Sequence, residues 1–451
     1  MHLSLSVSKS KLPLYLSYFG DGVSLALIQA FLPLYVYADL GETRLRVVAL
    51  LLALPALGTF VASHLWGAVA DRTGRLRPWL LVGLAGHILV LASLMVLHSA
   101  ASVLAVAVVS SLLFAAIGPT LKTWVTLGST QSVGQALSDV LRFQSWGWFA
   151  GSLGTGFLLD RAGLSLPAVA LLAMLPALAA LAASLAWLPD VRKPTSSAAH
   201  PPRVGGEKAP APLLETLQDL YRARPLWPLF LTILAAVLAN ESFFAVLGVY
   251  FTQVVAGSRE LMGFSLALAT LLGALLYPLA GRFVDRHGPE KVLTAAAATY
   301  LAVYLAIASV RNPYVVAVAF GVPLYPVLIT AAASVMTQRS LLAQRGGGLG
   351  IVDGLFALGL AGGSLLGGVL GDVLGLAAVP WASSLLAALA VGGSLWVRLA
   401  ATSSAAAPPA PGAATGECGA EHAGFPGSAG ADIRPLAGIA GPEAKESPVE
   451  R

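Results

Sequence analysis

Long apolar runs separated by short polar segments follow one another along most of the chain. Each run covers the roughly 20 residues that a helix needs to cross the hydrocarbon core of a bilayer. In the first part of the chain they lie at about 12–38, 46–66, 78–98, 101–123, 139–160 and 165–188. In the second part they lie at about 226–252, 260–280, 290–310, 312–336, 349–371 and 376–400. The pattern predicts an all-α integral membrane protein with twelve transmembrane helices.

Two polar regions divide the chain into four parts. Residues 189–225 are rich in Pro, Ser, Ala and charge, which is typical of a linker. The segment beyond about residue 401 is poor in bulky apolar side chains, and we expect it to be disordered. The predicted domains are an N-terminal six-helix bundle (1–188), a cytoplasmic linker (189–225), a C-terminal six-helix bundle (226–400) and a disordered cytoplasmic tail (401–451).

The composition argues against several other classes of protein. Hydrophobic residues make up 57% of the chain and charged residues 11%, whereas ordinary soluble domains carry about 25% charged residues. The single cysteine, Cys418, lies in the tail, so we expect no disulfide framework, no cysteine metal site and no cofactor. The net charge of +5 comes from residues dispersed among loops, so it does not predict nucleic-acid binding.

Lysines and arginines are distributed unevenly between alternate loops. Most of them fall on the side that also holds both termini and the linker, whereas the opposite loops contain Arg44, Arg46, Arg161, Arg259 and Arg311. The positive-inside rule makes the richer side cytoplasmic. We therefore expect a multi-pass protein of the cell (inner) membrane with both termini in the cytoplasm. Its first apolar run is interpreted as a retained helix rather than a cleaved signal peptide.

The loops after the second and eighth spans repeat one motif. They read GAVADRTGRLRP from Gly67 and GRFVDRHGPEKV from Gly281. The shared Gly, Asp, Arg and Gly align at a constant offset of 214 residues (281 − 67 and 285 − 71). A second pair, GSLGTGFLLDRAGL from Gly151 and GSLLGGVLGDVLGL from Gly363, lies in the fifth and eleventh spans at an offset of 212 (363 − 151). The two halves therefore form a parallel, pseudo-symmetric repeat, and a solute site is expected near the midplane between them.

The pattern Gly-x-x-x-Asp-Arg-x-Gly-Arg after the second span, with its weaker copy after the eighth, resembles the signature loop of the major facilitator superfamily. The resemblance covers residues 12–400 and implies two bundles that rock about a central cavity, with the signature loop governing the switch. It implies that Asp71 faces the N-terminal end of the eleventh helix, whose dipole favours a carboxylate. The second copy lacks an arginine equivalent to Arg75. The residues assigned to the conformational-switch loops are Gly67, Asp71, Arg72, Gly74, Arg75, Gly281, Asp285, Arg286 and Gly288.

Two acidic residues fall inside predicted spans, where lipid does not tolerate a charge. At a rise of 1.5 Å per residue, Asp21 lies about 14 Å along the first helix, near the bilayer centre. It is interpreted as a site that takes up and releases a proton, or alternatively as a neutral residue that fixes helix packing. Glu241 lies about 22 Å along the seventh helix. It is a second candidate for a proton or solute site. The alternative is a role in outer gating or in contact with lipid headgroups.

Other polar residues extend this list of candidates. Asn240, Gln29, Gln144 and Trp146 are candidates for the proton or solute site, and Trp148 is a further candidate for lining a cavity. A tryptophan in a membrane helix more often serves packing or interfacial anchoring.

A candidate gate pair lies at the start of the fifth span. Asp139 and Arg142 are three residues apart on one helix face and can pair there. Alternatively, both side chains can snorkel to the interface. Close helix contacts are expected where glycines recur every four residues, at Gly147, Gly151, Gly363, Gly367 and Gly371.

These observations favour a secondary active transporter of a small organic solute, working by alternating access. The sequence contains no nucleotide-binding P-loop, so an ion gradient is the expected source of energy. Proton coupling is expected because Asp21 can take up and release a proton. Export and uptake are nearly equal alternatives, and we expect a monomer. The alternative from another class is a membrane assembly factor, pigment-handling factor or sensor of the same shape. An enzyme is not expected, because the sequence lacks a metal-spaced histidine cluster and a Gly-x-Ser-x-Gly motif.

Overall fold

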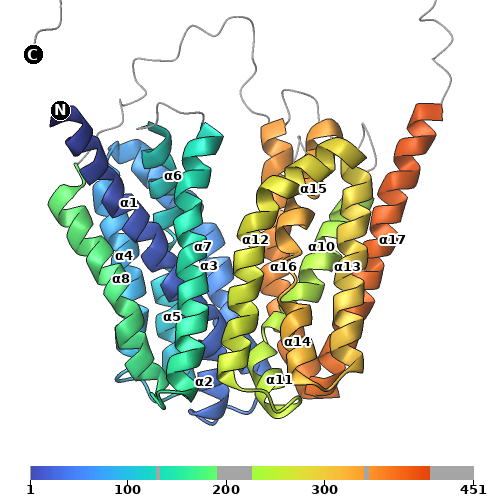
Figure 1. The fold of residues 1–451 in the computed structure, drawn as a ribbon, viewed down its shortest axis with the longest axis horizontal. Coiled ribbons are helices and arrows are strands. Elements are labelled where there is room, and N and C mark those ends of the chain that lie inside the picture. The colour runs from blue at the N-terminus through green and yellow to red at the C-terminus, as the bar shows by residue number, and fades with distance from the viewer. Residues whose placement is uncertain (1, 128–132, 190–225, 340–344, 407–451) are drawn as a thin grey trace, which may run out of the picture. The chain divides into compact units, whose positions relative to one another are not determined.

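A computed structural model describes residues 2–127, 133–189, 226–339 and 345–406 (Figure 1). Nearly all of the predicted linker and of the predicted tail lies outside these residues. The described helices correspond one to one with the twelve predicted spans, which confirms the all-α membrane class. Ten helical segments of the described part are long and apolar enough to cross a membrane, and the third span is a shorter apolar helix, Arg77–Ser93.

Six spans form the N-terminal half. They are α1 (His2–Ala26) continued by the π-helical turn η1 (Leu27–Phe31) and α2 (Leu32–Ala38), then α3 (Leu45–Thr73), α4 (Arg77–Ser93), α5 (Ala100–Phe114) continued by α6 (Ile117–Leu127), α7 (Val133–Asp160) and α8 (Leu166–Trp187).

Six further spans form the C-terminal half. They are α10 (Trp227–Phe244) continued by α11 (Leu247–Gln253), then α12 (Arg259–His287), α13 (Pro289–Ser309), α14 (Pro313–Phe320) continued by α15 (Tyr325–Arg339), α16 (Arg345–Leu374), and the 3-10 turn η3 (Leu376–Ala378) leading into α17 (Val379–Ala406).

The first, fourth, seventh and tenth spans are each interrupted near the middle. The first contains the π-helical turn, and the fourth, seventh and tenth break between α5 and α6, α10 and α11, and α14 and α15. These spans occupy equivalent places, because each begins a group of three helices. Interrupted helices are tolerated at membrane depth only where other protein groups or a cavity satisfy the freed backbone. The symmetry of the breaks therefore points to the centre of the molecule as the functional region.

Several helices extend beyond the predicted spans. The second span was expected to end near residue 66, but α3 continues to Thr73, so Asp71 and Arg72 lie in its last turn rather than in a loop. Gly74 ends this helix in the left-handed conformation, with φ of 65°. In the same way, α12 includes Asp285 and Arg286 in its last turn. The hydropathy window missed these turns because their exposed face is polar.

Glycines bring particular helix pairs into backbone contact. A Cβ at Gly147 would overlap the carbonyl oxygen of Phe19, so α7 lies directly against α1. At Gly367 a Cβ would overlap the carbonyl oxygen of Ser242, which joins α16 to α10 in the same way. These contacts confirm the expectation that the spaced glycines of the fifth and eleventh spans serve close packing.

The two halves meet through two symmetric helix pairs. Helix α7 of the N-terminal half packs against α12 of the C-terminal half, and α3 of the N-terminal half packs against α16 of the C-terminal half. Gly156 of α7 lies against the backbone at Arg259, and Gly368 of α16 lies against the backbone at Leu45. Both approaches are at the helix ends where α2 and α11 also lie, at the lower edge of Figure 1. By the predicted topology this is the outer end of the protein.

The packing at Gly367 gives a direct test. We expect Gly367→Ala to destabilise the protein by about 1–3 kcal/mol, the usual range for an overpacked contact. Thermal unfolding of purified protein in detergent should show a lowered midpoint. Gly392→Ala is the matched control, because no atom lies within 4 Å of a Cβ built there. Equal midpoints for the two variants would contradict the close contact between α10 and α16.

Candidate functional site

A cavity of about 510 Å³ lies between the two halves. Its walls come mainly from the interrupted first, seventh and tenth spans and from α7, α12 and α13. The residues that line it are Gln29, Gln144, Ser145, Trp148, Asn240, Glu241, Phe244, Ala269, Thr270, Gly273, Ala274, Tyr277, Tyr300, Val303, Tyr304, Phe320, Val322, Pro323, Leu324, Tyr325 and Pro326. The cavity therefore includes four of the six residues that the sequence proposed for a proton or solute site.

The lining is aromatic and contains one ionisable acid. Seven of the described lining residues carry aromatic rings. Glu241 is the only described lining residue with a carboxylate. No lysine, arginine or histidine is found among the described residues that line this cavity. The remaining polar groups are the amides of Gln29, Gln144 and Asn240 and a few hydroxyls. Such a lining favours a solute with an apolar body and few polar groups.

Glu241 is held by a short chain of hydrogen bonds. The Asn240 amide donates to Oε1 of Glu241 over 2.9 Å. In turn, the Tyr304 hydroxyl of α13 donates to the side-chain oxygen of Asn240 over 3.0 Å. Gly363 of α16 leaves room for the Glu241 stem, because a Cβ there would come within 2.7 Å of it. The buried Glu241 side chain is thus held by Asn240 at its carboxylate and by α16 at its stem.

Asp21 lies behind the cavity wall, inside the N-terminal half. Its side chain is 9% exposed, and the Gln144 amide donates to its Oδ2 over 2.6 Å. Gln144 also lines the cavity, so one residue touches both sites. The contact requires α1 and α7 to approach closely, and Gly22 provides for this because a Cβ there would overlap the Gln144 carbonyl oxygen.

A histidine that the sequence analysis did not single out lies on the other side of Asp21. His87 of α4 is fully buried, and its Nε2 is 3.4 Å from Oδ1 of Asp21. Its ring packs against Phe114, with centroids 4.6 Å apart. Neither ring nitrogen makes an aligned hydrogen bond in the described structure, so the 3.4 Å approach is an ion-pair contact without hydrogen-bond geometry. The only sequence signal was one ionisable residue within an apolar span.

The two remaining polar candidates differ in position. Gln29 reaches the cavity from the π-helical turn, a local geometry that is frequent at functional sites. Trp146 does not lie in the cavity wall: its side chain is half exposed and packs against Phe149. Trp148 lines the cavity instead. Two tryptophans only two residues apart project in different directions on a helix, and their positions in the sequence do not show which of them faces the cavity.

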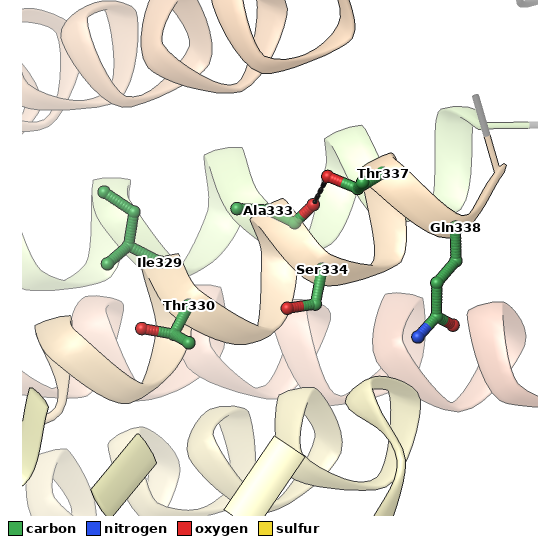
Figure 2. A pocket seen from close by; sticks show the side chains of 6 residues that line it. All are labelled: Ile329, Thr330, Ala333, Ser334, Thr337 and Gln338. Carbon is green, nitrogen blue, oxygen red and sulfur yellow. Dashed lines mark hydrogen bonds between the residues drawn. The ribbon is translucent and has the colours of Figure 1, made fainter. Parts of the chain in front are cut away.

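A polar stripe continues along α15 from the cavity. Figure 2 shows Thr330, Ser334 and Gln338 on the same side of this helix, lining a second hollow of about 550 Å³. Tyr325 and Pro326, one turn earlier, belong to the central cavity. The Thr330 and Thr337 hydroxyls donate to carbonyls of their own helix, so they present little unpaired polarity. This side of α15 runs from the residues of the central cavity toward the end of the helix that is predicted to be cytoplasmic.

Two aspartates close the opposite end of the cavity by symmetric contacts. At the end of α7, Asp160 accepts a hydrogen bond from the Glu260 N–H at the start of α12, over 2.7 Å. At the end of α16, Asp372 accepts from the N–H groups of Leu45 and Arg46 at the start of α3, over 2.6 and 3.1 Å. Each carboxylate caps a helix N-terminus of the other half, where free N–H groups and the helix dipole favour a negative charge.

Ion pairs surround these two caps. Arg161 binds Glu260 at 2.7 Å, and Arg46 and Arg259 lie 3.7 and 3.8 Å from Asp372 and Asp39. All three pairs join one half to the other. The sequence analysis treated these arginines as topological charges only. The sequence signal that was missed is the aspartate shared by the two aligned segments that begin at Gly151 and Gly363.

The switch loops and the candidate gate pair are only partly described. Asp71, Arg72 and Arg75 are exposed at the end of α3 and just after it. The side chain of Asp139 and the first residues of α16 lie outside the described side chains. The pairing of Asp139 with Arg142, and of Asp71 with the eleventh helix, therefore stay predictions.

Comparisons with known proteins agree on one fold. The sequence model of the Major Facilitator Superfamily matches residues 14–343 and, in a second overlapping match, residues 257–439. A comparison with curated proteins finds no match. The crystal structure of a mutant of the nucleoside transporter NupG superimposes with a TM-score of 0.65 at 13% identity, covering 86% of this chain and 99% of that one. The crystal structure of the human organic anion transporter MFSD10 (TETRAN) gives 0.58 at 19% identity, with the same coverage.

The aspartate caps lead to a prediction about the closed end. Each cap contributes about 0.5–2 kcal/mol, so Asp160→Ala combined with Asp372→Ala should weaken this contact between the halves. The reporter is Leu34→Cys in a Cys418→Ser background, because Leu34 is 3% exposed and lies against Gly248 of the other half. A membrane-impermeant maleimide added from the side of the 39–44 loop should label it about tenfold faster in the double variant.

A loop carboxylate supplies the control. Glu42 accepts hydrogen bonds from Arg44 in its own loop, and these lower the pKa of Glu42 to about 2. Glu42→Gln removes a carboxylate from the same end without touching either cap, so labelling should not change. An unchanged labelling rate in the Asp160 and Asp372 double variant would contradict a role of the caps in closure.

Proposed function

Because the chain belongs to the Major Facilitator Superfamily, we propose that it is a secondary active transporter that couples proton movement to the movement of a small organic solute. The family and the two transporter structures support secondary transport as the general activity. The observation that carries the finer proposal is the position of Asp21, which is buried beside His87 and linked to the cavity through Gln144.

Burial makes Asp21 suited to carry a proton. An ionised carboxylate in a low-dielectric interior is several kcal/mol less stable than in water unless a partner compensates it. Gln144 gives one hydrogen bond, and His87 is close enough to form an ion pair when it is protonated. Tyr18, one turn earlier on α1, is another titratable group nearby, and its buried hydroxyl has no hydrogen-bond partner among the described residues. The site is electrically stable only with a proton bound or with His87 charged.

Gln144 provides a physical route for coupling. Its side chain contacts Asp21 and also forms part of the cavity wall. A solute that draws the Gln144 amide toward itself removes a hydrogen bond from the Asp21 carboxylate, which changes the stability of the ionised form. Proton affinity and solute affinity are linked in this way, and the linkage acts equally in both directions. Export and uptake both remain compatible with it.

Alternating access requires the two ends of the cavity to open in turn. The aspartate caps and ion pairs hold the predicted outer end together, and they must separate when that end opens. We propose that Asp71 and the neighbouring signature residues stabilise the opposite state, in which the predicted cytoplasmic end is closed. Two sets of contacts of this kind give two states whose populations a ligand can shift.

The proposal is tested by proton flux in proteoliposomes that contain a pH-sensitive dye. Pools of sugars, nucleosides, organic anions and amines are added to vesicles with wild-type protein, and flux that depends on one pool is expected. Asp21→Asn should lose this flux by at least about tenfold, because the amide cannot exchange a proton. Glu42→Gln, in an outer loop, should retain it.

Two results would contradict different parts of the transport proposal. Solute-dependent flux that persists in Asp21→Asn would show that another group carries the proton. No flux with any pool, from protein shown to be folded, would instead support the alternative that the fold serves assembly or sensing.

The switch proposal is tested separately at Asp71. Asp71→Lys should reduce transport several-fold while leaving the amount of protein in the membrane unchanged, because reversing the charge places it unfavourably at a helix N-terminus. The equivalent change in the second copy, Asp285→Lys, should have a smaller effect, since that copy lacks the second arginine. Loss of Asp71→Lys protein from the membrane would show a folding role instead.

A further inference from the structure

We propose that the central cavity selects a monovalent organic cation, with its charge near Glu241 and its apolar body between the aromatic rings. This inference rests on the proposed transport function, which it deepens by naming the class of solute. It is carried by three properties of the described cavity: the sign of its charge, the nature of its walls and its size.

The charge of the cavity has one sign. Glu241 is the only acid among the lining residues, and no basic side chain of the described lining offsets it. No ion pair involves Glu241 in the described part of the chain. Its hydrogen-bond partner among the described residues is the neutral Asn240 amide, which donates to Oε1 and does not cancel the charge. An organic anion entering this space would meet an uncompensated carboxylate, whereas a cation would neutralise it in a medium where the attraction is stronger than in water.

The aromatic rings suit the same type of ligand. Tyr300 and Tyr304 are stacked with centroids 6.2 Å apart, and Phe244 and Phe320 are parallel at 6.3 Å. All four line the cavity that contains Glu241. Ring faces attract ammonium groups through cation–π interactions, and this attraction increases when the site is desolvated. A carboxylate and several aromatic rings in one cavity are the groups that recognise an organic ammonium group.

The size of the cavity sets a limit on the body of the solute. Its volume of about 510 Å³ lies within the usual range of small-molecule sites, roughly 300–1,000 Å³. Amide groups on the opposite wall, Gln29 and Gln144, can pair with one or two polar substituents. The fitting solute is therefore an amine with one aromatic or comparable apolar group, rather than a bare metal cation or a long lipid.

Cation binding also agrees with proton coupling. The buried carboxylate is neutralised either by a proton or by the ammonium group, and one excludes the other. Cation binding at Glu241 is linked through Gln144 to the proton that Asp21 carries, and exchange of cation and proton across these two linked sites would give proton–cation antiport.

Three compounds with one 4-hydroxyphenyl body separate the effect of charge. Tyramine carries an ammonium group, tyrosol a hydroxyl and 4-hydroxyphenylacetate a carboxylate. Their dissociation constants are measured by calorimetry on purified full-length protein in detergent near pH 7. Tyramine should bind at least about tenfold more tightly than tyrosol, and 4-hydroxyphenylacetate should bind most weakly.

Variants then assign the preference to one carboxylate. Glu241→Gln should weaken tyramine binding at least about tenfold and leave tyrosol binding within about twofold. Glu241→Asp keeps the charge and should keep the preference for tyramine, which separates loss of charge from loss of fold. Glu42→Gln is the control outside the cavity.

The inference is overturned by equal affinities, by tighter binding of 4-hydroxyphenylacetate, or by no binding of any of the three compounds. A tyramine preference that survives Glu241→Gln overturns it as well. Failure of the transport proposal would look different: tyramine would bind as expected, but no solute would move protons. Proton flux driven by an anion or a sugar, without tyramine binding, would contradict the cation inference alone.

Discussion

The structure depends on one constraint, which is the free energy of placing a carboxylate where lipid surrounds the protein. Asp21 and Glu241 are each buried within a half of the molecule, and neither forms a salt bridge with lysine or arginine among the described residues. Each is held by a side-chain amide, from Gln144 and from Asn240. Such a group persists at membrane depth only if it can be neutralised. Its neutralisation, by a proton or by a solute, is then the event to which the rest of the protein can respond.

Glycine packing brings two helices together at each of these carboxylates, and at Asp21 it also allows the Gln144 amide to reach the carboxylate. Gly22 and Gly147 bring α1 against α7, and Gly363 and Gly367 bring α16 against α10 at Glu241. The repeat thus places one tightly packed helix pair beside each carboxylate. The halves differ in what they add: the N-terminal half adds His87, and the C-terminal half adds most of the aromatic cavity wall. Pseudo-symmetric scaffolds of this kind can separate a proton site from a solute site while keeping them adjacent.

The sequence predicted the spans, the repeat and the glycine contacts because these follow from local apolar runs and from spacing along one helix. It also identified Glu241 and Gln144, since polar residues inside a span are rare. It did not identify His87, whose meaning depends on its contact with a different helix. The inter-half role of Asp160 and Asp372 was missed for the same reason, although both aspartates stood in the aligned repeat. Helix ends were misjudged, and the choice between Trp146 and Trp148 was left open, because hydropathy records composition and not the direction of a side chain.

The central claim is that solute binding and proton binding at the buried carboxylates are linked. It is tested most directly by proton release on binding: tyramine is added to purified protein in weakly buffered detergent solution, and the released protons are counted with a pH indicator. Release that depends on tyramine concentration, saturates with the binding curve and is reduced in Asp21→Asn is the expected result. Saturating tyramine binding with no proton release between about pH 5 and 9, the range that covers shifted carboxyl and histidine groups, would contradict the linkage.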